Sequence, residues 1–265
     1  MHDLPAGYDF RTYERWFLDF TQGYLQGSDF DTANIRIKIN HTLRVLGFAR
    51  QITKNLDLTP VLQEMAHLAA LFHDIGRFPQ YARYKTYNDK VSVNHATEGV
   101  RTMKQHGVLA GFPPQSQHLI LGAIALHNRR FLPNQLPVKV RLLTQIVRDA
   151  DKLDIFAVML AHFDPRIPYN KVINLELKPD PDNYTPAILE KVQARQSVNY
   201  QHLTWVNDFK LMLCSWLYDL NYPVSQGLAR EKGYLDKLLD YLPKTPEFEH
   251  LGRQLRQTLQ DALDR

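Results

Sequence analysis

Residues 68–78, LAALFHDIGRF, place a histidine and an aspartate side by side at the end of an apolar segment. Burying His73 and Asp74 there costs several kcal/mol unless a partner satisfies both polar groups. Imidazole nitrogen and carboxylate oxygen are suitable ligands for Mn²⁺, Fe²⁺, Zn²⁺ or Mg²⁺. The pair alone also fits a helix-terminal histidine stabilised by the helix dipole. A metal site therefore needs further ligands elsewhere in the chain.

A third candidate ligand precedes this pair. From Asn40 onward the sequence predicts a helix, because His41, Val45, Phe48 and Ile52 recur at helical spacing on one face. His41 therefore lies on an apolar face, where an unpaired imidazole is costly. A hydrogen-bonded core histidine is the alternative to a metal ligand at this position.

A fourth candidate comes from IVRDADKLDIF, residues 146–156. Helical periodicity puts Asp151 and Asp154 on the same stripe as apolar residues, so Asp151 takes the place of a core residue. Asp149 fits better as a solvated surface acid that pairs with Arg148 and Lys152. Asp149 or Asp154 could orient a ligand histidine from outside the ligand set.

These ordered motifs resemble the H…HD…D pattern of the HD-domain superfamily of metal-dependent phosphohydrolases. HDIGRF is typical of its central motif and DADKLD of its last, and the resemblance covers about residues 30–160. It implies an all-α bundle whose residues converge on one divalent metal ion. The implied ligands are His41, His73, Asp74 and Asp151.

Two more histidines, His95 and His127, fall between the HD pair and the last aspartate. In this respect the sequence is similar to the six-ligand members of the superfamily, in which two such histidines hold a second metal and the aspartate of the HD pair bridges both ions. The alternatives are that His95 and His127 contact the substrate phosphate directly, or that both only make hydrogen bonds. The sequence leaves all three interpretations open.

The resemblance implies hydrolysis of a phosphate monoester or diester, in a nucleotide or another small molecule, by metal-activated water. Asp74, Arg77 and Lys152 are the expected catalytic residues, since Arg77 and Lys152 adjoin ligands and could stabilise charge on phosphoryl oxygens. The expected substrate-binding residues are Arg77, Lys152, His95 and His127. The cofactor is one or two divalent ions of Mn, Mg, Fe, Ni or Zn. Arg129 and Arg130 are more typical of solvent-facing charges.

Two other functions are compatible with the same ligands. One is a di-iron oxygenase of the HD fold, and the other is a non-catalytic HD module that binds a nucleotide or another ligand. The complete ligand set argues against the non-catalytic module. No GYP tripeptide follows His127, so the sequence does not support a cyclic-dinucleotide phosphodiesterase.

Hydrophobic periodicity predicts an all-α protein. Beyond the helices that carry the motifs, the expected helices are 9–26, 95–107, 115–127, 138–161, 186–221, 225–241 and 246–263. Residues 164–186 hold five prolines and predict a long loop, with a short strand at 172–177. We expect residues 1–265 to form a single helical unit, in which a C-terminal extension, 186–265, packs on an HD core at about 30–160.

Composition and charge indicate which classes of binding partner to expect. The net charge is only +4 and the basic residues are scattered, which does not favour sequence-specific nucleic-acid binding. No apolar run is long enough to cross a membrane, and the N-terminus lacks a signal-peptide core. One cysteine, Cys214, excludes an internal disulfide and fits a core position in a cytoplasmic protein. We expect a small phosphorylated, nucleotide-like substrate and no membrane partner. The sequence is also compatible with a homodimer.

Overall fold

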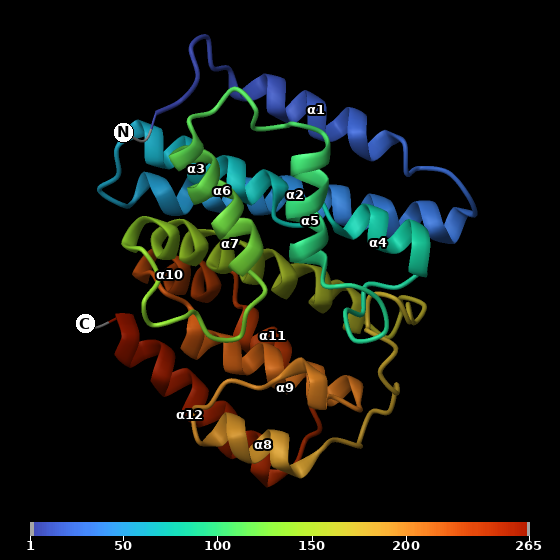
Figure 1. The fold of residues 1–265 in the computed structure, drawn as a ribbon. Coiled ribbons are helices and arrows are strands. Elements are labelled where there is room, and N and C mark those ends of the chain that lie inside the picture. Colours follow the sequence, from blue (N-terminus) through green and yellow to red (C-terminus); the bar gives the residue numbers. More distant parts are fainter. Residues whose placement is uncertain (1–2, 264–265) are drawn as a thin grey trace. The chain divides into compact units, whose positions relative to one another are not determined.

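The computed structural model describes residues 3–263, and helices dominate its secondary structure (Figure 1). The described residues contain no strand, so the predicted all-α class is confirmed. The chain divides into two compact units, one ending at Asp154 and the other beginning at Ile155. The predicted packing of the C-terminal helices on the core stays a prediction.

The first unit contains the helices that carry the candidate site. They are α1 (Phe10–Gln22), α2 (Asp29–Lys54), α3 (Pro60–Phe72), α4 (Arg77–Tyr84), α5 (His95–Gln105), α6 (Pro114–Leu126) and the larger part of α7 (Val138–Phe163). The central helix is α3, which contacts α1, α2 and α6. Every residue from Met65 to Phe72 is buried, which explains its nearly continuous apolar sequence.

Capping residues fix where these helices begin. Thr59 accepts a hydrogen bond from the Leu62 amide, and Pro60 lies in the first turn of α3. Ser28 caps α2 in the same way, so α2 begins at Asp29 and the predicted start at Asn40 was too late. The acidic residues Asp29 and Asp31 in its first turn also favour this start.

The turn after the HD pair depends on Gly76. Gly76 has an ordinary right-handed backbone, so it does not end α3 through a left-handed conformation. A glycine is needed here because there is no room for a side chain. A Cβ atom at this position would lie 2.2 Å from the His95 carbonyl oxygen and 2.4 Å from the Gly99 amide nitrogen. The missing side chain thus lets the start of α5 pass directly over the HDIG turn, which brings His95 close to Asp74.

The second unit continues α7 and adds α8 (Pro186–Gln193), α9 (Val206–Trp216), α10 (Pro223–Glu231), α11 (Tyr234–Asp240) and α12 (Pro246–Leu263). The strand predicted at 172–177 is wrong: these residues form turns, and Lys178 makes an isolated bridge with Trp205. Leu175 and Glu176 have positive φ angles, which an extended strand does not allow.

Buried polar groups hold the proline-rich loop of this unit. Asp208 accepts hydrogen bonds from the amides of Thr185, Thr204 and Trp205.

Cys214 is fully buried, as predicted. Among the described residues, no helix is both long and apolar enough to cross a bilayer.

Candidate metal centre

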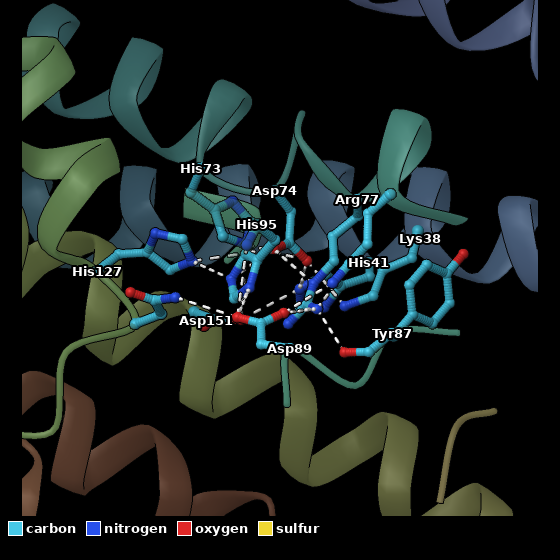
Figure 2. A network of polar contacts seen from close by, with 12 residues as sticks. Lys38, His41, His73, Asp74, Arg77, Tyr87, Asp89, His95, His127 and Asp151 are labelled. Atoms are coloured by element: carbon cyan, nitrogen blue, oxygen red, sulfur yellow. Dashed lines mark hydrogen bonds and ion pairs between the residues drawn. The ribbon is translucent and has the colours of Figure 1, made fainter. Parts of the chain in front are cut away.

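Four histidines point one ring nitrogen, Nε2, toward a common point, and each is fixed through the other, Nδ1 (Figure 2). His73 Nδ1 donates to the Ala70 carbonyl at 2.7 Å, and His127 Nδ1 donates to the Ile124 carbonyl at 2.8 Å. A carbonyl can only accept, so the Nδ1 atoms of both rings carry the proton. Their Nε2 atoms are therefore left with lone pairs.

Carboxylates hold the other two imidazoles in the same way. His41 Nδ1 lies 2.7 Å from Asp154 Oδ2, and His95 Nδ1 lies 2.7 Å from Asp89 Oδ2. This arrangement, in which a carboxylate orients a histidine from behind, is common around metal ligands. The suggestion that Asp154 orients a histidine is confirmed.

Asp151 faces the histidines from α7, as the helical stripe predicted. Its Oδ1 atom lies 3.1 Å from His41 Nε2 and 3.6 Å from His73 Nε2. Its side chain is 18% exposed, whereas Asp74 is only 4% exposed, so Asp151 is the more open of the two acids. Residues distant in the chain thus meet at one place.

Asp74 lies between two pairs of histidines and offers one oxygen to each pair. Oδ2 is 3.6 Å from His41 Nε2 and 3.8 Å from His73 Nε2. Oδ1 is 3.4 Å from His95 Nε2 and 3.9 Å from His127 Nε2. The geometry forms two adjoining half-sites that share one carboxylate.

The protonation states favour cation binding. Burial raises the pKa of Asp74, but Lys38 and the neighbouring His73 and Arg77 outweigh it and hold the pKa well below its usual range. Burial opposes ionisation of Asp151 as well, yet its pKa is also lowered, because the imidazoles of His41 and His73 face its carboxylate. Both acids are anionic at neutral pH.

The pKa values of three of the histidines shift in different directions. Burial, followed by the charges of His95 and His73, lowers the pKa of His127 to about 3. Burial and Arg77 also lower the pKa of His95. For His41, burial and Lys38 lower the pKa, but the neighbouring carboxylates of Asp151 and Asp154 outweigh them and raise it. His95 and His127 are thus held neutral, the form that ligates metals.

The residues present fit a divalent metal ion. The Nε2 atoms of His41 and His73 are buried and have no hydrogen-bond partner. Leaving such atoms unsatisfied in a protein interior is costly, and a cation would satisfy both. Three overlapping trios have ligand atoms within 4.8 Å of one another: His41, His73 and Asp74; His73, His127 and Asp151; and Asp74, His95 and His127.

Comparison with known families agrees with this geometry. The HD domain family model matches residues 39–155, the segment that carries all six of these side chains. Residues 39–155 are an HD domain. The chain matches no curated protein and no solved structure at a significant level. HD domains are commonly metal-dependent hydrolases, and the His and Asp residues of this domain could hold a metal.

The basic residues predicted for catalysis lie in different settings. Arg77 borders the HD-domain site and lies 3.5 Å from Asp74 Oδ1, but its guanidinium donates to Gln80, the Tyr87 carbonyl and Asp89. Lys152 is buried on α7 beside Asp151. Arg129 and Arg130 are exposed, as expected. Catalytic roles for Arg77 and Lys152 stay predictions.

One expectation about a neighbouring residue needs revision. Asp149 is fully buried, so its interpretation as a solvated surface acid is wrong. Tyr81 and Tyr87 are buried as well, and their hydroxyls donate to Asp31 and to the Asn34 carbonyl. Both hydroxyls thus bind residues of α2.

Three residues at the site were missed by the sequence reasoning. Lys38 places its Nζ atom 2.8 Å from Asp74 Oδ2. Asp89 joins His95 to Arg77. Arg148 donates to the carbonyls of His127, Arg129 and Arg130 and so holds the chain that follows α6. Lys38 could have been found, since it lies one helical turn before His41 on the same face.

Proposed function

We propose that this protein is a metal-dependent phosphohydrolase that cleaves a phosphate ester of a nucleotide or another small molecule. The observation that carries the proposal is the convergence of four Nε2 atoms and two aspartates on one buried centre. A structural core has no need to bring so many potential ligand atoms together, and two of them, His41 Nε2 and His73 Nε2, have no hydrogen-bond partner. Bound divalent ions would supply Lewis acidity, which activates water and polarises a phosphoryl oxygen.

The ligand set supports two metal ions better than one. His41, His73, Asp74 and Asp151 would hold the first ion, and Asp74, His95 and His127 the second. Support comes from the two oxygens of Asp74, which face different histidine pairs. This division also favours His95 and His127 as ligands over direct contacts with the substrate phosphate. Mn, Fe, Zn, Ni and Mg all remain compatible with nitrogen and oxygen ligands.

The surrounding residues have separate tasks in such a reaction. Asp154 and Asp89 fix the rings of His41 and His95 from behind. Arg77 and Lys38 bring positive charge to the edge of the site, which favours a phosphate group over a neutral substrate. Asp151, the more exposed acid, lies where water and substrate can approach.

A metal-reconstituted substrate screen tests the proposal. The metal-depleted protein would be loaded in turn with Mn²⁺, Fe²⁺, Zn²⁺, Ni²⁺ and Mg²⁺ and assayed with nucleotides and with general phosphomonoesters and phosphodiesters. We expect hydrolysis with at least one metal and its loss in Asp74→Ala. Asp182→Ala, on an exposed loop, is the matched control and should retain full activity. Hydrolysis that persists in Asp74→Ala would remove the mechanism.

A di-iron oxygenase is the second candidate, because the same six side chains suit two irons. Aerobic purification distinguishes the two functions. Two irons per chain together with oxygen consumption, and no phosphate release from any substrate, would favour the oxygenase.

A further inference from the structure

Lys38 contacts one half of the candidate metal centre through Asp74. It lies on α2, three residues before His41, and its side chain is only 15% exposed. Its ammonium group donates to Asp74 Oδ2 at 2.8 Å and lies 5.4 Å from the centre of the Tyr87 ring. Figure 2 shows Lys38 beside Tyr87 and Arg77, at the edge of the histidine cluster.

The oxygen that Lys38 contacts is also a candidate metal ligand. Asp74 Oδ2 faces His41 Nε2 and His73 Nε2, the two buried nitrogens that have no hydrogen-bond partner. A divalent ion held by these three atoms would share Oδ2 with an ammonium group. Two cations at one oxygen, in a site screened from water, repel each other strongly. The ammonium and the metal ion therefore compete for Oδ2.

The Lys38 ammonium can move away from Asp74, whereas the Arg77 guanidinium cannot. The Arg77 guanidinium is fixed by Gln80, Asp89 and the Tyr87 carbonyl. Lys38 ends in a single charged group on a flexible four-carbon stem, so it can swing away from Oδ2 without breaking a network. Its partial exposure gives it room toward solvent.

We propose that Lys38 is a displaceable cation that neutralises Asp74 before metal binding and then turns to the substrate. When a metal ion takes Asp74 Oδ2, the ammonium moves off that oxygen and becomes the binding partner of a phosphate oxygen. The first step depends only on the metal site. The second step rests on the proposed phosphohydrolase function and assigns the anionic phosphate group to Lys38.

Amine labelling of the intact chain tests both steps. The metal-free protein, the Mn²⁺-loaded protein, and the Mn²⁺-loaded protein with inorganic phosphate would be methylated reductively, and the rate at each lysine measured by mass spectrometry. We expect Mn²⁺ to speed labelling of Lys38 about tenfold or more, because Asp74 no longer holds it. Phosphate should then slow it again. Lys85, which pairs with Asp31 on an exposed surface, is the internal control and should not respond.

Calorimetric titration with Mn²⁺ alone provides a second readout. Lys38→Met should bind Mn²⁺ about tenfold more tightly than the unaltered protein, because the competing charge is gone. Lys38→Arg keeps the charge and should not gain affinity, and Lys85→Met should match the unaltered protein. Thermal unfolding of each variant verifies that the fold is retained.

The outcomes separate the steps from each other and from the proposed function. A Lys38 labelling rate that Mn²⁺ leaves unchanged, or a Lys38→Met variant that binds Mn²⁺ no more tightly, overturns the displacement. Faster labelling that phosphate does not reverse overturns the substrate contact alone. If no phosphate ester is hydrolysed, the proposed function fails, while the labelling and Mn²⁺ titration still decide the first step.

Discussion

His95 and His127 bring their Nε2 atoms to within 3.1 Å of each other. Asp89 and the Ile124 carbonyl hold the opposite nitrogens of the two rings, so neither ring can turn away without losing a hydrogen bond. Two lone pairs at that distance repel each other unless a cation or a proton lies near both. Because the pKa of both rings is lowered, chiefly by burial, a metal ion is the better candidate.

Removal of one ring of this pair should abolish one half-site. We predict that His127→Ala lowers the metal content from two ions per chain to one, since His41, His73, Asp74 and Asp151 remain. His118→Ala, on the outer part of the same helix, is the control and should retain two ions. Elemental analysis after dialysis measures the ratio. Unchanged stoichiometry in His127→Ala would contradict the division of Asp74 between two ions.

Asp89 should matter although it is not a predicted ligand. We expect Asp89→Asn to weaken metal binding by roughly 10–100-fold, because the carboxylate that orients His95 becomes a weaker acceptor. The comparison variant is Asp180→Asn, in the exposed turn that also holds Asp182 and Asn183. Calorimetric metal titration of both variants is the measurement. Equal affinity in the two variants would show that Asp89 only supports the loop.

Gly76 and Gly47 make a matched pair of glycines in the first unit. Gly76→Ala should destabilise the protein by about 1–3 kcal/mol or more, since a Cβ atom would collide with the backbone of α5. At Gly47, inside α2, nothing lies within 4 Å of the added atom, so Gly47→Ala should stabilise by up to about 1 kcal/mol. Urea unfolding of both variants tests the contrast, and destabilisation of the same size in both would refute it.

The lowered pKa of Lys210 should make the free energy of unfolding depend on pH. Burial lowers its pKa from 10.5 to about 8, although its ammonium donates to Asn207 and the Tyr241 carbonyl. Between about pH 8 and pH 10 the unfolded chain keeps a proton that the folded chain has released. The free energy of unfolding should therefore rise over this interval. Lys210→Met should lack the rise in urea unfolding at stepped pH, and a rise of equal size in both proteins would exclude Lys210 as its source.

Sequence reasoning found the residues whose chemistry conflicts with their surroundings. His41 and Asp151 interrupt apolar helix faces, and HDIGRF interrupts a buried helix, so each was detectable from periodicity. Asp89 lies in an irregular segment, and only tertiary structure brings it to His95. Asp149 carries a charge between two basic residues, which is a typical surface pattern, yet its helix turns it inward.

Hydrophobic periodicity also predicted the all-α fold class. It did not predict the turns at 172–177 or the position of Lys38 at the site. The alternation of VINLEL favoured a strand at 172–177, where Leu175 and Glu176 have positive φ angles instead. A lone strand has no neighbour to pair with in a helical unit, so its alternation has no structural consequence. Lys38 was overlooked because a lysine on a helix is usually a solvated charge.

We infer that the four histidines and two aspartates hold divalent metal ions. The most direct measurement is anomalous X-ray diffraction from crystals of the full chain loaded with Mn²⁺. We predict strong anomalous peaks on both sides of Asp74, one within ligand distance of His41, His73 and Asp151, the other within ligand distance of His95 and His127. A map with no peak at either position, from protein shown to contain Mn²⁺, would contradict it.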